Sequence, residues 1–165
     1  MPTPTTYTMT KIPSGEAGTI ETLKYMARLV RAYKTHPLIF QLSRHLTKSL
    51  KQKDFAGEAK VIHAFVRDKI RYVKDVNGVE TLQTPVKTLE IGTGDCDDKS
   101  TLTATLLESL GHPTRFVVVG HSPGKFCHVY LETKIGSRWF AIETTEPWQM
   151  GEVRKKLPYK KVWHI

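Results

Sequence analysis

Hydrophobic residues in the first part of the chain recur every three or four positions, the spacing of one face of an α-helix. The first helix is predicted to follow an N-cap at Thr19, with inward residues Ile20, Leu23, Ala27, Val30 and Tyr33. A second is predicted from Pro37, with Leu38, Leu42, Leu46 and Leu50 inward. A third is predicted from about Glu58, with Ile62, Phe65, Val66 and Ile70 inward. Residues 1–18 are rich in Thr, Pro and Gly and are predicted to form a loose arm.

The pattern changes in the second half of the chain. After a predicted turn at 75–80, a fourth helix carries Leu102, Leu106, Leu107 and Leu110, and Gly111 and Pro113 end it. Strands are then predicted over 115–120, 127–133 and 137–143. A long flexible loop, GHSPGKF, joins the first two strands, and a short turn, IGS, joins the second and third. Helices followed by an antiparallel sheet predict an α+β fold, as one domain over residues 19–165.

Charge and cysteine content narrow the class of protein. The 165 residues carry a formal net charge of +9, and the basic residues cluster weakly, at Lys24, Arg28 and Arg31 and at Arg154, Lys155, Lys156, Lys160 and Lys161. No recognised nucleic-acid motif accompanies them, so we expect a solvated basic surface and no nucleic-acid partner. The chain shows no secretory signal and no apolar run long enough to span a membrane, and its two cysteines do not make a disulfide framework. A cytoplasmic protein with free thiols is therefore expected.

One cysteine lies in an unusual place, within GTGDCDDKS at residues 92–100. Cys96 is predicted to begin the fourth helix, where unpaired backbone N–H groups and the helix dipole favour a thiolate. The carboxylates of Asp95, Asp97 and Asp98 oppose that effect at short range. A neighbouring imidazolium would therefore be needed to activate Cys96.

The strand at 127–133 supplies an imidazole. Alternation places His128, Tyr130 and Glu132 on one face and Cys127, Val129 and Leu131 on the apolar face. Cys127 is accordingly predicted to be a buried, unreactive thiol, and Cys96 the reactive one. On the next strand Glu143 shares a face with Trp139, so its carboxylate could reach the imidazole of His128. That order supplies a nucleophile, a base and a carboxylate that orients the base.

The residues that carry this pattern resemble a known family. GDCDDKSTLTATLLESLGHPTRFVVVG, FCHVYLE and RWFAIETTEP are similar to the transglutaminase-like branch of the papain-type cysteine enzymes. IRYVKD at 70–75 and TLQTPVKTL before the cysteine look like the versions carried by bacteriophages and prophages. The resemblance covers about residues 58–147. It implies a catalytic triad of Cys96, His128 and Glu143, in which Glu143 replaces the family's usual Asp and Glu146 is the substitute.

The resemblance implies acyl transfer from an amide, without a cofactor. Water as acceptor gives hydrolysis of a peptide or protein amide, which is the expected reaction; an amine as acceptor gives crosslinking. The alternative from another class is a non-enzymatic phage module for assembly or binding. Oligomeric state stays open.

Further residues are candidates for supporting roles. The backbone N–H of Cys96 is available as one oxyanion donor, and Gln83 and Tyr72 are candidates for a second. Trp139 is a candidate substrate contact, although core packing is the commoner role of such a residue. His121, in a loop, is a weaker base than His128, and no partner is evident for His36, His45, His63, His112 and His164. Cys96, Cys127 and His128 are not expected to bind zinc, because adjacent residues on opposite faces of a strand aim poorly at one ion.

Overall fold

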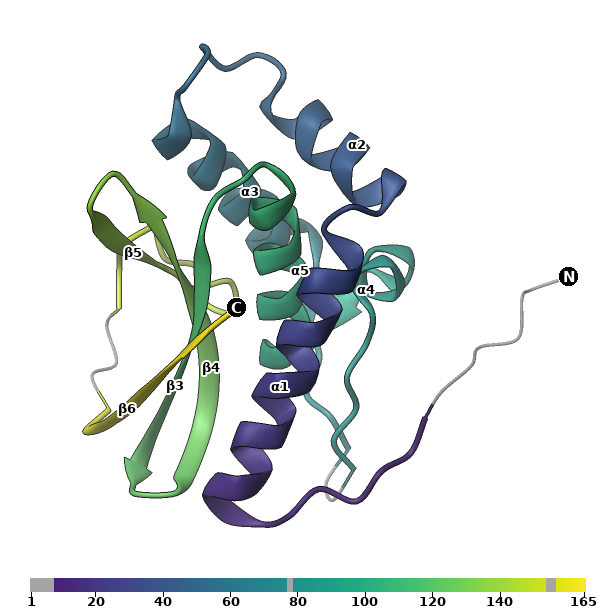
Figure 1. Cartoon of the computed structure of the whole chain (residues 1–165), viewed down its shortest axis with the longest axis vertical. Helices are drawn as coiled ribbons and strands as arrows, with labels where there is room; N and C mark the ends of the chain where they lie inside the picture. Colours follow the sequence, from purple (N-terminus) through teal and green to yellow (C-terminus); the bar gives the residue numbers. More distant parts are fainter. Residues whose placement is uncertain (1–7, 77–78, 154–156) are drawn as a thin grey trace, which may run out of the picture.

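The computed structural model describes residues 8–76, 79–153 and 157–165. It has two layers, with the helices on one side and an antiparallel sheet on the other (Figure 1). In the described residues the helices are α1 (Gly15–Tyr33), α2 (Pro37–Thr47), α3 (Phe55–Lys69), α4 (Pro85–Ile91) and α5 (Cys96–Ser109). The strands of the sheet are β3 (Thr114–Ser122), β4 (Lys125–Ile135), β5 (Arg138–Ile142) and β6 (Tyr159–His164), in the order β5-β4-β3-β6. The predicted α+β fold is confirmed.

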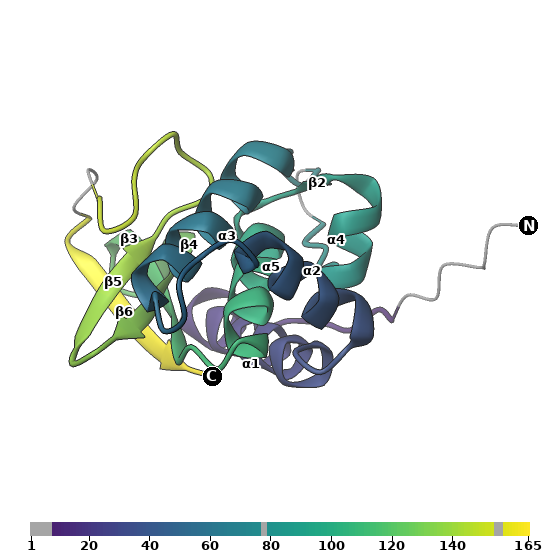
Figure 2. The same ribbon diagram turned by 90° about the horizontal axis from the view of Figure 1, so that it is seen from above.

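Helix α5 lies at the centre of the molecule, between the sheet and the other helices (Figure 2). Every residue from Asp98 to Leu107 is buried, so this helix has no solvent face along its middle. Its threonines satisfy their hydroxyl groups locally: Thr101, Thr103 and Thr105 each donate to the carbonyl four residues earlier, at 2.6–2.7 Å. Polar side chains can therefore be buried around α5 without unpaired donors.

Two helices, α1 and α3, begin earlier than predicted, because their N-caps are other residues than the sequence suggested. Helix α1 begins at Gly15 rather than after Thr19, with Ser14 as N-cap. Helix α3 begins at Phe55, because the Asp54 side chain accepts a hydrogen bond from the backbone N–H of Gly57 at 2.9 Å. In α2 the predicted start at Pro37 is confirmed, and Leu42 and Leu46 of the predicted inward stripe pack, partly buried, against the core, but the fully buried residues are others. The buried residues there are Ile39 and Ser43, while Leu38 is 44% exposed.

Three short elements had no prediction. Helix α4 and the parallel pair of β1 (Arg71–Tyr72) and β2 (Thr93–Gly94) lead the chain into α5. Strand β6 pairs with β3, and its two lysines make ion pairs, Lys160 with Glu132 at 3.0 Å and Lys161 with Glu16 at 2.6 Å. Arg154, Lys155 and Lys156 of the basic C-terminal cluster lie outside the described residues, as do residues 77–78 of the predicted turn and residues 1–7 of the predicted arm. No helix in the described ranges combines the length and apolarity that crossing a membrane requires.

The segment GHSPGKF is a tight hairpin rather than a long loop. Strands β3 and β4 continue to Ser122 and Lys125, so that only two residues separate them. The pairing is irregular near this end: Val119 is opposite His128, but Gly120 is opposite Phe126. Cys127 is therefore an extra residue in β4, a β-bulge. A Cβ at Gly120 would lie 2.1 Å from the Lys125 carbonyl oxygen, so only glycine allows this close approach.

Candidate active site

The segment GTGDCDDKS forms the junction between α4, β2 and α5. Gly92 ends α4 with a positive φ of 66°, the usual role of a glycine after a helix. Asp95 caps α5 and accepts from the Asp98 backbone N–H at 3.1 Å, and the Asp98 carboxylate accepts in turn from the Asp95 backbone N–H at 3.3 Å. Asp98 also accepts from the backbone N–H of Gln83 at 2.8 Å. Two of the three carboxylates around Cys96 therefore serve the start of the helix.

Cys96 is the first residue of α5, as predicted, and is partly buried against the main core. Its Sγ lies 3.7 Å from Oδ1 of Asp97, the carboxylate that has no capping role. Burial raises the pKa of the Cys96 thiol, and the negative charges of Asp97 and Asp95 add to that increase. A hydrogen bond to the backbone of Val129 acts in the opposite direction but does not compensate. These effects oppose the thiolate that the start of the helix would favour, so activation of Cys96 would depend on a neighbouring imidazole, as the sequence predicts.

Cys127 does not occupy the core, contrary to the prediction. The bulge breaks the alternation of β4, so Phe126 packs against the main core together with Val129, and Cys127 is exposed. The Cys127 Sγ contacts the carbonyl oxygen of Val119 at 3.7 Å. Thiol-directed experiments on Cys96 consequently need a Cys127→Ser background, because Cys127 is the more accessible thiol.

His128 lies on β4 and Glu143 directly follows the neighbouring strand β5, and the structure brings the two side chains together. His128 Nε2 lies 2.5 Å from Glu143 Oε2. The other carboxylate oxygen of Glu143 accepts from the backbone N–H and the hydroxyl of Thr145, at 2.9 and 2.8 Å. Burial acts to raise the pKa of Glu143, but the hydrogen bonds and charge supplied by His128 and Thr145 outweigh it, so the pKa is lowered and the carboxylate is ionised. With Nε2 engaged, the free ring nitrogen of His128 is Nδ1.

Cys96 and His128 line the same cleft, whose volume is about 950 Å³. The start of α1 and the residues before it form one wall, the segment after β1 a second, and the β3–β4 hairpin a third. Tyr72 lines this cleft as well. The cleft is therefore large enough for a segment of extended peptide.

The other predicted site residues lie elsewhere. The Gln83 side chain accepts from the Thr88 hydroxyl at 3.2 Å and does not line the cleft. Trp139 packs against the Arg115 guanidinium, 4.2 Å from its ring centre, and is also outside the cleft. No described side chain makes a hydrogen bond to that of Glu146, whose backbone carbonyl accepts from Trp148. In the described residues no group of three or more His, Cys, Asp or Glu side chains is arranged to bind a metal ion.

Three of the histidines without an evident partner in the sequence have one in the structure. His63 of α3 is buried and its Nε2 lies 2.5 Å from the backbone oxygen of Glu143. His112 contacts Glu58 at 2.6 Å, and His36 caps α2 by accepting from the Leu38 backbone N–H. No local pattern marks His63, because its partner is 80 residues away in the sequence.

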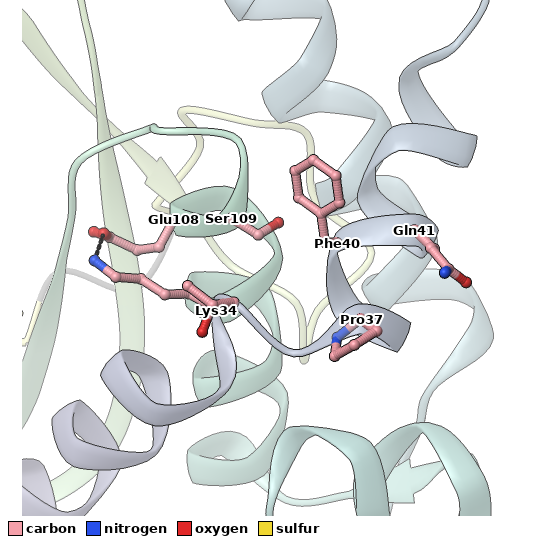
Figure 3. A pocket seen from close by; sticks show the side chains of 7 residues that line it. Lys34, Pro37, Phe40, Gln41, Glu108 and Ser109 are labelled. Atoms are coloured by element: carbon pink, nitrogen blue, oxygen red, sulfur yellow. Dashed lines mark hydrogen bonds and ion pairs between the residues drawn. The ribbon is translucent and has the colours of Figure 1, made fainter.

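A second, smaller hollow lies at the far end of α5 (Figure 3). Lys34, Pro37, Phe40, Glu108 and Ser109 line it, and the Lys34 ammonium contacts the Glu108 carboxylate at 3.4 Å. Glu108 and Ser109 end the helix that Cys96 begins, so about 20 Å of helix separates the two hollows. This hollow therefore plays no part in the chemistry of Cys96.

The position of Asp97 predicts a pH effect that its amide variant should remove. Burial raises the pKa of Asp97 to about 7, and the nearby carboxylates of Asp95 and Glu80 contribute. Because the folded state holds this proton more tightly than the unfolded chain, stability should be greatest at acidic pH and fall as the pH rises toward 7. In a Cys127→Ser background, Asp97→Asn should raise the free energy of unfolding at pH 8 by roughly 1–3 kcal/mol.

The same variant should lower the pKa of Cys96, because it removes the nearest negative charge. We expect iodoacetamide to label Cys96 about tenfold faster at pH 8 in Asp97→Asn than in the parent. Glu90→Gln, an exposed carboxylate on α4 remote from the cleft, is the control. An unchanged labelling profile in Asp97→Asn would contradict the electrostatic coupling of Asp97 to Cys96.

Comparison with solved structures supports the fold. The chain aligns with a candidate protease from Parabacteroides distasonis (TM-score 0.62, 12% identity), covering 81% of this chain and 27% of that one. It aligns with a candidate cysteine protease from Cytophaga hutchinsonii (TM-score 0.56, 14% identity, 86% and 52% of the two chains). It also aligns with calcium-bound LapG from Legionella pneumophila (TM-score 0.56, 18% identity, 86% and 87%). The chain thus spans about a quarter and about half of the first two proteins.

Sequence comparison identifies the family. No curated protein sequence matches the chain. A family model described as the transglutaminase-like superfamily matches residues 41–144, more than half of the chain and a range that contains Cys96, His128 and Glu143. The protein belongs to the transglutaminase-like superfamily.

Proposed function

We propose that the protein cleaves an amide bond in a peptide or protein substrate, with Cys96 as nucleophile, His128 as base and Glu143 as the group that orients His128. The observation that carries this proposal is the 2.5 Å contact of His128 with Glu143 at the cleft that Cys96 also lines. The two solved structures described as candidate proteases agree with it. A bacteriophage or bacterial origin belongs to the proposal, on the basis of the quoted sequence motifs, and so does a cytoplasmic location, on the basis of the two free thiols.

The first step is attack of Cys96 on the substrate carbonyl group. As Sγ of Cys96 bonds to the substrate carbonyl carbon, its proton passes to Nδ1 of His128 and the carbonyl oxygen becomes an oxyanion. When the oxyanion collapses, the C–N bond breaks and the imidazolium gives its proton to the departing amine. The product is a thioester on Cys96. Water, deprotonated by His128, then attacks the thioester, releases the acid and restores the thiol.

Glu143 supports both proton transfers. Its carboxylate accepts from Nε2–H of His128, which fixes the ring, leaves Nδ1 free to act as the base and places a negative charge opposite the imidazolium. The Thr145 hydrogen bonds hold that carboxylate in place. The extra methylene of Glu, relative to the Asp usual in the family, is accommodated by this arrangement.

Tyr72 is the better candidate for the second oxyanion donor. It lines the cleft, whereas the Gln83 amide is engaged with Thr88 outside it. Burial raises the pKa of the Tyr72 phenol, and the negative charges of Asp95 and Asp97 add to that increase, so Tyr72 remains a hydrogen-bond donor at neutral pH. The backbone N–H of Cys96 is the first donor.

Acylation by an activated ester tests the proposal directly. In a Cys127→Ser background, p-nitrophenyl acetate should release one burst equivalent of nitrophenol, and peptide mapping should locate the acetyl group on Cys96. The acetyl-enzyme should then be hydrolysed by water. Added glycine ethyl ester distinguishes the acceptors, because transfer of most acetyl groups to this amine would indicate crosslinking. Absence of acylation at Cys96 would favour a non-enzymatic binding module.

A further inference from the structure

His63 contacts the candidate triad at Glu143, through the main chain of that residue rather than its side chain. It lies on α3, is only 2% exposed, and places Nε2 2.5 Å from the carbonyl oxygen of Glu143. Because a carbonyl oxygen only accepts, Nε2 must carry the hydrogen. Burial lowers the pKa of His63, so the ring is neutral and its donor nitrogen is fixed by this one partner.

The main chain at Glu143 needs such support because the strand has ended. Pairing between β4 and β5 stops at Leu131 opposite Ile142, the residue before Glu143. Both carboxylate oxygens of Glu143 are used, one by His128 and one by Thr145. A backbone shift of Glu143 would therefore move the oxygen that holds His128, and the His63 hydrogen bond opposes that shift.

Helix α3 is also joined to the helix that carries Cys96. The ammonium group of Lys99, one turn along α5 from Cys96, is buried and donates to the Ile70 carbonyl oxygen at 2.5 Å. At the same end of α3, Arg67 donates to the Trp148 carbonyl oxygen at 2.9 Å, which ties down the chain beyond Glu143. The end of α3 thus contacts α5, the helix that begins with Cys96, and also the segment that follows Glu143.

We propose that His63 is a positioning residue for the triad, which holds Glu143, and through it His128, at a fixed distance from the helix of Cys96. This inference rests on the proposed function. His63 does not contact the substrate, so its removal should alter the orientation of the His128 imidazole rather than the binding of substrate. A misoriented imidazole is expected to slow acylation about 10- to 100-fold.

Two nearly isosteric substitutions isolate the hydrogen bond. In the Cys127→Ser background, His63→Gln retains an N–H donor, whereas His63→Met fills similar space without one. The measurement is the pH profile of Cys96 acylation by p-nitrophenyl acetate. We expect His63→Met to slow acylation 10- to 100-fold and to shift the profile, and His63→Gln to restore most of the rate. Should His63→Met not fold, His63→Asn, one methylene short of the Gln reach, should show the same slowing.

A matched control is a second histidine that contacts α3 from outside it. His112 is 5% exposed and contacts Glu58 of α3, so His112→Met also removes a buried histidine contact to α3, but one remote from Glu143. It should lower thermal stability and leave the pH profile unchanged.

A double variant tests whether His63 acts through Glu143. In a Glu143→Gln background His63→Met should slow acylation less than it does in the parent, because the link between Glu143 and His128 is already weakened. A parent protein that is not acylated at Cys96 would refute the proposed function. A parent that is acylated, together with an unaltered His63→Met profile, would refute the positioning role alone.

Discussion

Replacing Cys96 with alanine should abolish amide cleavage and leave the fold intact. The thiol sulfur forms the covalent bond to the substrate in the proposed mechanism, and the other thiol in the cleft, Cys127, is an exposed residue of the β4 bulge rather than the first residue of a helix. We expect a loss of at least 1000-fold in turnover. Because Cys96 is only partly buried, the unfolding free energy should change by about 1 kcal/mol.

The measurement combines peptide cleavage with a thermal melt of the same samples. Cys127→Ser is the matched control, since it removes the other thiol and should keep most of the activity. Activity that survives in Cys96→Ala and disappears in Cys127→Ser would exchange the roles of the two cysteines. A large loss of stability in Cys96→Ala would instead identify Cys96 as a packing residue.

His128→Gln should reduce the acylation rate of Cys96 by about 10²- to 10⁴-fold. The cost should be at the upper end of that range, because the raised pKa of Cys96 leaves almost no thiolate at neutral pH for a reaction without a base. The remaining rate should rise with hydroxide concentration, tenfold per pH unit, over a range in which the parent has already levelled off.

Variants of Glu143 supply a graded comparison with His128→Gln. Glu143→Gln keeps a partner for the imidazole without its charge and should weaken acylation less than loss of the base does. Glu143→Asp keeps the charge but is one methylene shorter than Glu143, and it should slow acylation less than Glu143→Gln does.

Equal pH profiles for His128→Gln and the parent would remove His128 from the mechanism.

The candidate triad could be predicted from sequence because each member is marked by a local signal. Cys96 stands at a helix start recognisable from its glycines and carboxylates, His128 lies on β4, and Glu143 directly follows β5, the strand that pairs with β4. What alternation could not reveal is the bulge at Cys127, since it depends on the approach of two backbones at Gly120. A strict period of two therefore assigned the wrong environment to Cys127.

Other features depend on contacts between distant segments. The inward face of α2 is shifted from the predicted one: Leu42 and Leu46 are only partly buried, whereas Ile39 and Ser43 are fully buried, and the Ser43 hydroxyl donates to the Leu106 carbonyl oxygen of α5. The pKa of Cys96 follows from how deeply the helix start is buried, which no spacing of charges determines. The contact of His63 with Glu143 likewise arises only in the folded molecule.

The bulge at Cys127 constrains how the hairpin between β3 and β4 can change in length during evolution. A strand presents alternate residues to opposite faces, so loss of one residue reverses every side chain on one side of the deletion. Here Phe126 and Val129, three positions apart, both reach the main core, and His128 between them faces Glu143. Deleting Cys127 alone would remove the bulge and leave Phe126 and Val129 two positions apart, so both would still reach the core and His128 would still face Glu143. The hairpin can therefore lose this one residue without a change of phase, whereas loss of a single residue from the regular part of β4 would turn the side chains on one side of the deletion to the opposite face.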